Sequence, residues 1–116
     1  MFTRNRRKFL RLSAHHLVKY KIANKTTVCF ARNISAGGLL LYTQEEIAAG
    51  SILEIIINFP GKPKPLNLSA KVLRSKNLKQ IGGFEVGCQF LDIDKPTHDY
   101  INERIIRILG KENKPK

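Results

Sequence analysis

The fold of this chain is decided by the stretch Ile52-Leu-Glu-Ile-Ile-Ile-Asn-Phe-Pro-Gly-Lys-Pro-Lys-Pro-Leu-Asn-Leu-Ser-Ala-Lys-Val72. Apolar and polar residues alternate from Leu66 to Val72, and residues 52–59 place four large apolar side chains on one face. Such alternation is typical of strands that bury one face. The three prolines between these segments cannot donate to a β-ladder. Residues 60–65 are therefore predicted to be the loop of a β-hairpin.

The flanking sequence carries four more strand patterns. Predicted strands cover residues 17–22, 26–31, 39–43 and 84–90. The predicted connections are a turn at Asn24-Lys25, a chain reversal at residues 33–38, a polar link at 44–50 with one helical turn at 45–47, and a turn at Gly82-Gly83. Six strands at about ten-residue spacing indicate a mostly-β domain, either a small antiparallel barrel or a sandwich.

The last part of the chain has a helical pattern instead. Thr97 is the predicted N-cap, Asp99 is placed in the first turn, and Gly110 is expected to end the helix. The apolar residues fall on one stripe, at Ile101, Ile105, Ile108 and Leu109. We expect this C-terminal helix to close one end of the barrel.

The bulk properties suit one small domain of 116 residues. We expect a flexible basic arm at residues 1–12, the barrel and helix at 13–110, and a basic tail at 111–116. No apolar run approaches the ~20 residues that span a bilayer, and the N-terminus lacks the apolar core of a secretory signal. We expect a cytoplasmic monomer or weak dimer without membrane insertion, and two buried, reduced thiols at Cys29 and Cys88.

The charge of the chain is strongly positive. Lys and Arg number 21 against 9 Asp and Glu, which gives a net charge of +12. Such a field attracts anions and therefore predicts an anionic partner without naming it. Five of the cations lie within the first eleven residues, which contain no acid: Arg4, Arg6, Arg7, Lys8 and Arg11.

Two short motifs carry the chemistry. Arg7 and Arg11 lie four positions apart, and guanidinium groups bind phosphate or the O6/N7 edge of guanine bidentately. Residues 33–38, Asn-Ile-Ser-Ala-Gly-Gly, offer an amide, a hydroxyl and two glycines that permit positive φ and close approach of a ligand. Taken alone, the second motif could simply form a β-turn, and the two arginines could be solvated arm residues.

Taken together, the motifs resemble the PilZ domain, a bacterial receptor module for cyclic di-GMP. The family pattern is RxxxR followed by (D/N)xSxxG, which Arg7, Arg11, Asn33, Ser35 and Gly38 match in order. The resemblance implies a six-stranded antiparallel barrel with a C-terminal helix. It also implies second-messenger binding without a further cofactor, and signalling to a protein partner.

The resemblance implies a ligand site made of the following residues: Arg6, Arg7, Arg11, Asn33, Ser35, Gly37, Gly38 and Arg74. Arg74 is not part of either motif, but its place on the fifth strand predicts that it flanks the ligand. In the family, an arginine at the position of Arg6 accompanies binding of a stacked pair of ligands, which we expect here. Asn33 stands where many relatives have aspartate, and loss of that charge is expected to weaken one contact by about 1 kcal/mol.

Two alternatives stay open. The first is a small barrel that binds nucleic acid, which the charge favours but the scarcity of outward-facing aromatic residues does not. The second is a ligand-blind PilZ adaptor. An enzyme is not expected, because no nucleophile has a base and an orienting acid. A zinc site is not expected either, because adjacent His15 and His16 face opposite ways on a strand and His98 lies on the helix.

Overall fold

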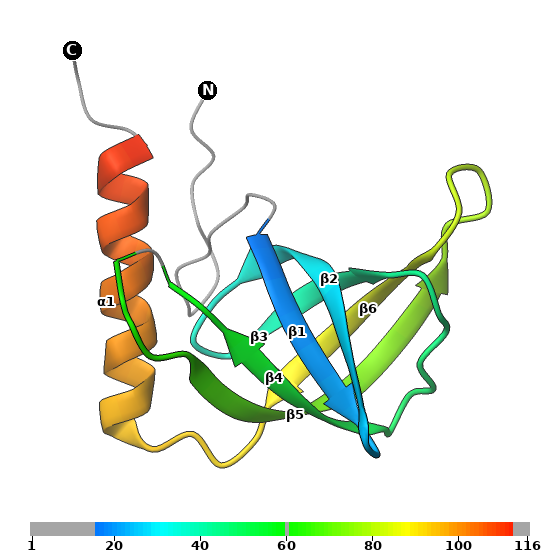
Figure 1. The fold of residues 1–116 in the computed structure, drawn as a ribbon, viewed down its shortest axis with the longest axis horizontal. Helices are drawn as coiled ribbons and strands as arrows, with labels where there is room; N and C mark the ends of the chain where they lie inside the picture. The colour runs from blue at the N-terminus through cyan, green and yellow to red at the C-terminus, as the bar shows by residue number, and fades with distance from the viewer. Residues whose placement is uncertain (1–15, 60, 113–116) are drawn as a thin grey trace.

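The structure, a computed structural model, describes residues 16–59 and 61–112, with side chains up to residue 107. This part of the chain contains six strands and one helix: β1 (His16–Ile22), β2 (Lys25–Ile34), β3 (Gly38–Thr43), β4 (Ile52–Ile57), β5 (Leu66–Asn77), β6 (Phe84–Phe90) and α1 (Lys95–Glu112). The strands pair antiparallel in the order β1-β2-β3-β6-β5-β4, and β1 pairs with β4 to close a barrel (Figure 1). The predicted barrel is confirmed, and the sandwich is excluded.

The alternation of the sequence becomes the inside and outside of the barrel. In β4 and β5 the predicted inward positions are buried, including Leu53, Ile55 and Val72, except for Leu66 at the start of β5, which is half-buried. Their cross-strand partners continue the same face around the barrel, since Leu53 pairs with Ala70 and Val72 with Cys88. Burial of this apolar face is the main driving force for folding, and it leaves the outward positions free for a binding surface.

The C-terminal helix α1 lies across one open end of the barrel (Figure 1). Ile101 and Ile105 are fully buried in the core, and the Phe59 ring meets the Tyr100 ring edge-on at 6.2 Å. The prediction that a helix closes the barrel is confirmed. The side chains of the two other predicted stripe residues, Ile108 and Leu109, lie outside the described residues.

The predicted start and end of α1 were wrong. The helix begins at Lys95, and the N-cap is Asp94, whose Oδ1 accepts a 2.9 Å hydrogen bond from the Thr97 backbone nitrogen. The first turn therefore contains no acid, and Asp99 comes one turn later, where it pairs with Lys95 at 3.0 Å. Gly110 does not end the helix, which continues for two more residues.

Two predicted connections differ in detail. The β1–β2 turn is formed by Ala23 and Asn24, because Ile22 pairs with Lys25, and Ala23 adopts a left-handed φ of 54°. A two-residue hairpin loop favours such positive φ values, so the turn lies one residue earlier than predicted. The helical turn predicted at 45–47 is absent from the link between β3 and β4.

Three strands also differ from their predicted bounds by two or more residues, and one of them, β2, continues to Ile34 instead of ending at residue 31. β4 ends at Ile57, although Phe59 beyond it is still buried against the helix. β5 continues past Val72 to Asn77, because an irregular register between Val72 and Arg74 lets the strand bend and keep its pairing with β6. This bend places Arg74 on the outer face beside β6.

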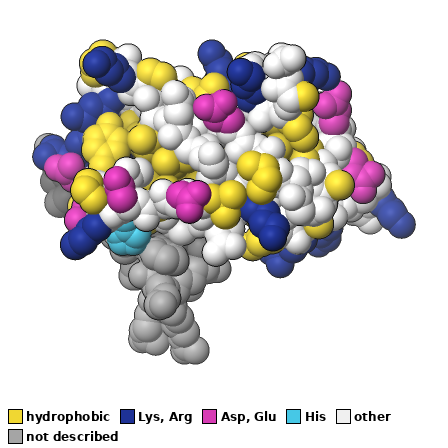
Figure 2. Space-filling view, turned by 90° about the horizontal axis from the view of Figure 1, so that it is seen from below, with side chains coloured by type: hydrophobic (Ala, Val, Ile, Leu, Met, Phe, Trp, Pro, Cys, Tyr) yellow, Lys and Arg dark blue, Asp and Glu magenta, His cyan; other side chains and the backbone are white. Residues whose placement is uncertain are grey.

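The outer surface mixes charged and hydrophobic side chains. On the face seen in Figure 2, hydrophobic side chains reach the surface between Lys, Arg and acidic side chains. Several large apolar residues of the described chain are more than 40% exposed: Leu17, Val28, Phe30, Ile52, Leu73, Ile81 and Ile106. Within the described residues, no helix is both long and apolar enough to cross a membrane.

Candidate functional site

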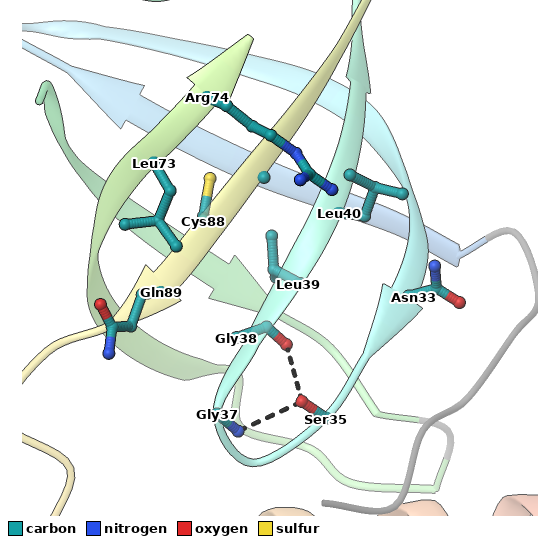
Figure 3. A pocket seen from close by; sticks show the side chains of 11 residues that line it. Asn33, Ser35, Gly37, Gly38, Leu39, Leu40, Leu73, Arg74, Cys88 and Gln89 are labelled. Carbon is teal, nitrogen blue, oxygen red and sulfur yellow. Dashed lines mark hydrogen bonds between the residues drawn. The ribbon is translucent and has the colours of Figure 1, made fainter. Parts of the chain in front are cut away.

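A groove of about 380 Å³ lies on the outer surface of the barrel, over the β3–β6–β5 strands and the end of β2 (Figure 3). We call it the glycine groove. Its lining residues are Asn33, Ser35, Gly37, Gly38, Leu39, Leu40, Leu73, Arg74, Gly87, Cys88 and Gln89. Five predicted site residues are therefore brought together here, from three strands and one turn.

Strand register explains why the groove forms at this place. Asn33 pairs with Leu40, Leu40 with Gly87, and Gly87 with Arg74, so these four residues form one row across β2, β3, β6 and β5. In the neighbouring row, Gly38 pairs with Gln89. Each row thus has one position without a side chain, and the two missing side chains leave a depression in the outer surface.

Gly38 is needed for packing rather than for a special backbone conformation. A Cβ at this position would collide with the carbonyl oxygen of Cys88 on β6. Neither Gly37 nor Gly38 is among the described glycines with positive φ, so the positive φ predicted for them was wrong, whereas close approach of a ligand to the backbone stays a prediction. Gly38 lets β3 and β6 approach closely, and this closeness forms the floor of the groove.

Ser35 organises the turn between β2 and β3. Its Oγ accepts a 3.2 Å hydrogen bond from the Gly37 nitrogen and donates a long 3.4 Å bond to the Gly38 carbonyl oxygen (Figure 3). The Ser35 nitrogen donates to the same carbonyl at 2.9 Å. The motif therefore does build a turn, as the alternative interpretation held. The hydroxyl lines the groove as well, and its long bond is a weak one.

Asn33 belongs to β2 rather than to the turn. The pairing of β2 with β3 shifts register between Ala31 and Asn33, so Arg32 is the bulged residue. β2 then continues to Ile34, which is buried, and the chain reverses only at residues 35–37. Asn33 is half-buried at the edge of the groove. The bulge thus turns a polar residue toward the groove just before the chain reverses.

Arg74 spans the opposite side of the groove. Its side chain lies over Gly87 toward Leu40 (Figure 3), and a Cβ on Gly87 would lie 3.6 Å from Arg74 Cγ and Nε. The arginine is exposed, and among the described residues it pairs with no carboxylate. Its guanidinium is therefore available to an anionic ligand.

The groove also contains lining residues that were not predicted from the sequence, among them Gln89, Leu40 and Leu73. Gln89 holds a carboxamide on the side opposite Asn33 (Figure 3), while Leu40 and Leu73 add apolar walls. A weak signal existed for Gln89, because it is the polar residue between the inward-facing Cys88 and Phe90. That pattern places Gln89 outside the barrel, but only the pairing with Gly38 shows that it meets the motif.

The three arginines of the predicted arm, Arg6, Arg7 and Arg11, lie outside the described residues. The structure does describe where the chain enters the barrel. β1 begins at His16, which pairs with Ala31, two positions before Asn33 on the neighbouring strand. Arg11 precedes His16 by five residues, which an extended chain can span over roughly 17 Å. The entry point is therefore near the glycine groove.

The two thiols of the chain are buried and free, as predicted. Burial raises the pKa of both Cys29 and Cys88 to about 12, so both thiols are protonated at neutral pH. A protonated, buried thiol is a poor nucleophile and metal ligand. Within the described residues, no group of three or more His, Cys, Asp or Glu side chains is placed to hold a metal ion.

Comparison with known proteins points to one family. The family model described as the PilZ domain matches residues 5–109. A search of curated protein sequences found no significant match.

Solved structures match the fold. The Bacillus subtilis inhibitor of motility MotI/DgrA has a TM-score of 0.76 at 20% identity, over 95% of this chain and 54% of that one. This chain thus spans about half the length of that protein. The PilZ domain of Escherichia coli YcgR, solved with c-di-GMP, has a TM-score of 0.70 at 20% identity, and the match covers 93% of this chain and 94% of that one. The K. pneumonia MrkH–c-di-GMP complex has a TM-score of 0.71 at 13% identity, and the match covers 97% of this chain and 56% of that one.

Proposed function

The chain belongs to the PilZ domain family, and on that premise we propose that it is a receptor for cyclic di-GMP. The observation that carries the proposal is the glycine groove, which brings the Asn33–Gly38 motif together with Arg74. The structures of YcgR and MrkH with c-di-GMP support the choice of ligand, since both share the fold of this chain. The proposed role is recognition rather than catalysis.

The groups in the groove suit a guanine nucleotide. Guanine presents O6 and N7 acceptors on one edge and N1–H and N2–H donors on another, and an arginine fork pairs with the first edge. The carboxamides of Asn33 and Gln89 can accept from the second edge and also donate. Leu40 and Leu73 provide apolar surface for the base, and the glycine floor allows it to approach the backbone.

The phosphates of the ligand need further cations, which the N-terminal arm would supply. Arg7 and Arg11 precede β1. The first residue of β1, His16, pairs with Ala31 on β2, two residues before Asn33. We infer that the arm closes over the ligand and places these two guanidinium groups on it. Ordering the arm costs conformational entropy, which charge-assisted hydrogen bonds of about 1.5–3 kcal/mol each must exceed.

The signal from the receptor to a protein partner would come from the same closure of the N-terminal arm over the ligand. Once the arm lies over the groove, it changes the surface next to β1 and β3, and a protein partner can distinguish the two surfaces. Arg6 adds a third cation beside Arg7. With this extra charge we infer that two stacked ligand molecules bind per chain, which the stoichiometry of a titration reports.

Calorimetric titration of the arginine variants tests the proposal. Arg7→Ala, Arg11→Ala and Arg74→Ala should each weaken cyclic di-GMP binding about ten- to a hundredfold, because each removes one charge-assisted contact and 1.4 kcal/mol is a factor of ten. Lys62→Ala removes the same charge from the exposed β4–β5 loop and should leave the affinity unchanged. Unchanged affinity in all three arginine variants would remove the proposed site.

A further inference from the structure

A second groove, of about 450 Å³, lies beside the glycine groove and has a different character. Its lining residues are Phe30, Arg32, Tyr42, Leu78 and Ile81. Phe30 pairs with Tyr42 on β3 and with Leu17 on β1, and Val28 comes two positions along β2. We call the surface of these seven residues the apolar face. Leu17, Val28, Phe30 and Ile81 are between 44% and 74% exposed.

The apolar face is held in place by its own hydrogen bonds. The loop between β5 and β6 is closed by the Leu78 nitrogen, which donates to the Gly83 carbonyl at 2.9 Å, and by the Gly82 nitrogen, which donates to the Leu78 carbonyl at 2.7 Å. The Tyr42 hydroxyl donates to the Gly82 carbonyl at 2.9 Å. The loop is thus pinned to β3 and lies on the side of the barrel away from α1 (Figure 1), and its residue Ile81 is exposed to solvent.

Positive charges outnumber negative ones around the apolar face. Lys19 pairs with Val28, Lys76 pairs with Glu85, and Lys79 lies in the loop between Leu78 and Ile81. The acid on this side, Glu85, is bound to Arg32 at 2.8 Å, and at the far end of β2 Glu45 is bound to Lys25. The face is therefore apolar at its centre and cationic at its edges, which is the anatomy of a protein-binding surface for an acidic partner.

We propose that the apolar face is the docking surface for an acidic amphipathic segment of a partner protein. A second copy is disfavoured, because a symmetric contact would place like cationic edges together on chains of charge +12. The chain's own N-terminal segment is disfavoured for the same reason, because residues 1–11 contain five cations and no acid. Nucleic acid would need stacking rings, which only Phe30 and Tyr42 supply among mostly aliphatic neighbours.

The position of the apolar face connects it to the ligand site. Glu85 and Gly87 lie two residues apart on β6, so the Arg32–Glu85 ion pair marks the edge of the apolar face that borders the glycine groove. A partner docked here would lie next to bound ligand. The proposal depends on the proposed receptor function for its biological role, whereas the docking itself does not require the ligand.

Three synthetic peptides of about 18 residues, or five helical turns, test the docking. They share one face of Leu and Phe and carry Glu, Gln or Lys on the other face. The Glu peptide should bind most tightly and the Lys peptide most weakly. Ile81→Asp should weaken binding of the Glu peptide at least tenfold. The matched control is Ile52→Asp, which adds the same charge at a residue of β4 that is 53% exposed, and it should change affinity much less.

The outcomes separate this proposal from the receptor function. Ile81→Asp should keep the wild-type affinity for cyclic di-GMP, so loss of peptide binding with ligand binding intact supports the docking surface. Equal binding of the three peptides, or equal effects of Ile81→Asp and Ile52→Asp, would overturn it. So would sedimentation showing that Ile81→Asp dissolves a homodimer, or a titration showing that it abolishes binding of a single-stranded oligonucleotide.

Discussion

Gly38 shows how one residue of a binding motif can serve the fold and the site together. Its missing side chain allows β3 to lie against the Cys88 carbonyl of β6, and the same absence deepens the groove. Gly87, in the neighbouring row, has a different environment. A Cβ there would make ordinary contacts of 3.6 Å with the flexible side chain of Arg74. Two glycines of one groove therefore differ in what they do for stability.

Alanine substitutions at these two glycines should separate the roles. Gly38→Ala should destabilise the protein by on the order of 1–3 kcal/mol, because β3 and β6 must move apart to admit a Cβ. Gly87→Ala should change stability by less than about 0.5 kcal/mol and act mainly on the ligand affinity, through the position of Arg74. Urea denaturation of both variants measures the difference. Equal stability of the two variants would contradict the close approach at Gly38.

At the scale of elements, β-bulges position the site. The bulge at Arg32 turns Asn33 to the groove, and the irregular register between Val72 and Arg74 does the same for Arg74 on β5. The start of α1 is fixed by a cap instead. The Asp94 carboxylate accepts hydrogen bonds from the Thr97 side chain and from the Thr97 backbone nitrogen, and these bonds hold the pKa of Asp94 below its ordinary value.

The cap gives a prediction about pH. Because folding lowers the pKa of Asp94, its contribution to stability is present above the ordinary carboxyl pKa near 4. That contribution is lost as the pH falls through the lowered pKa of the folded state. Asp94→Ala should lower the melting temperature at pH 7 and weaken the acid dependence, whereas Asp94→Asn keeps an acceptor and should lose only the acid dependence. Melting curves from pH 7 to pH 2 test this, and an unchanged acid dependence in both variants would contradict it.

The sequence predicted which strands and helix form better than it predicted where each of them begins and ends. Strict alternation of apolar and polar residues, as in Leu66–Val72, indicates a strand because the polarity of each residue matches the buried or exposed face on which it lies. Barrel closure could not be derived from such local patterns, because it depends on the pairing of β1 with β4, more than thirty residues away. The same contrast between local patterns and long-range pairing applies to the candidate site. Asn33, Ser35 and Gly38 could be found as a motif, whereas Gln89 meets them only through strand register.

At the scale of the whole molecule, the closed barrel formed by the described strands leaves none of them with a free edge, so binding would use the outer surface of the barrel. Two surfaces lie side by side on it, the glycine groove with its amides and arginine and the apolar face, whose border toward the groove is the Arg32–Glu85 ion pair. The net charge of +12 favours anionic partners at both. Selectivity between anionic partners must then come from the local groups. These are amides and an arginine in the glycine groove, and apolar side chains on the apolar face.

A titration of the ¹⁵N-labelled protein with cyclic di-GMP, followed by amide chemical shifts, tests the central claim most directly. The account predicts saturable shifts at Asn33, Gly37 to Leu40, Arg74 and Gly87 to Gln89, together with the amides of Arg7 and Arg11. Absence of shifts, or shifts confined to the apolar face around Phe30 and Ile81, would contradict it.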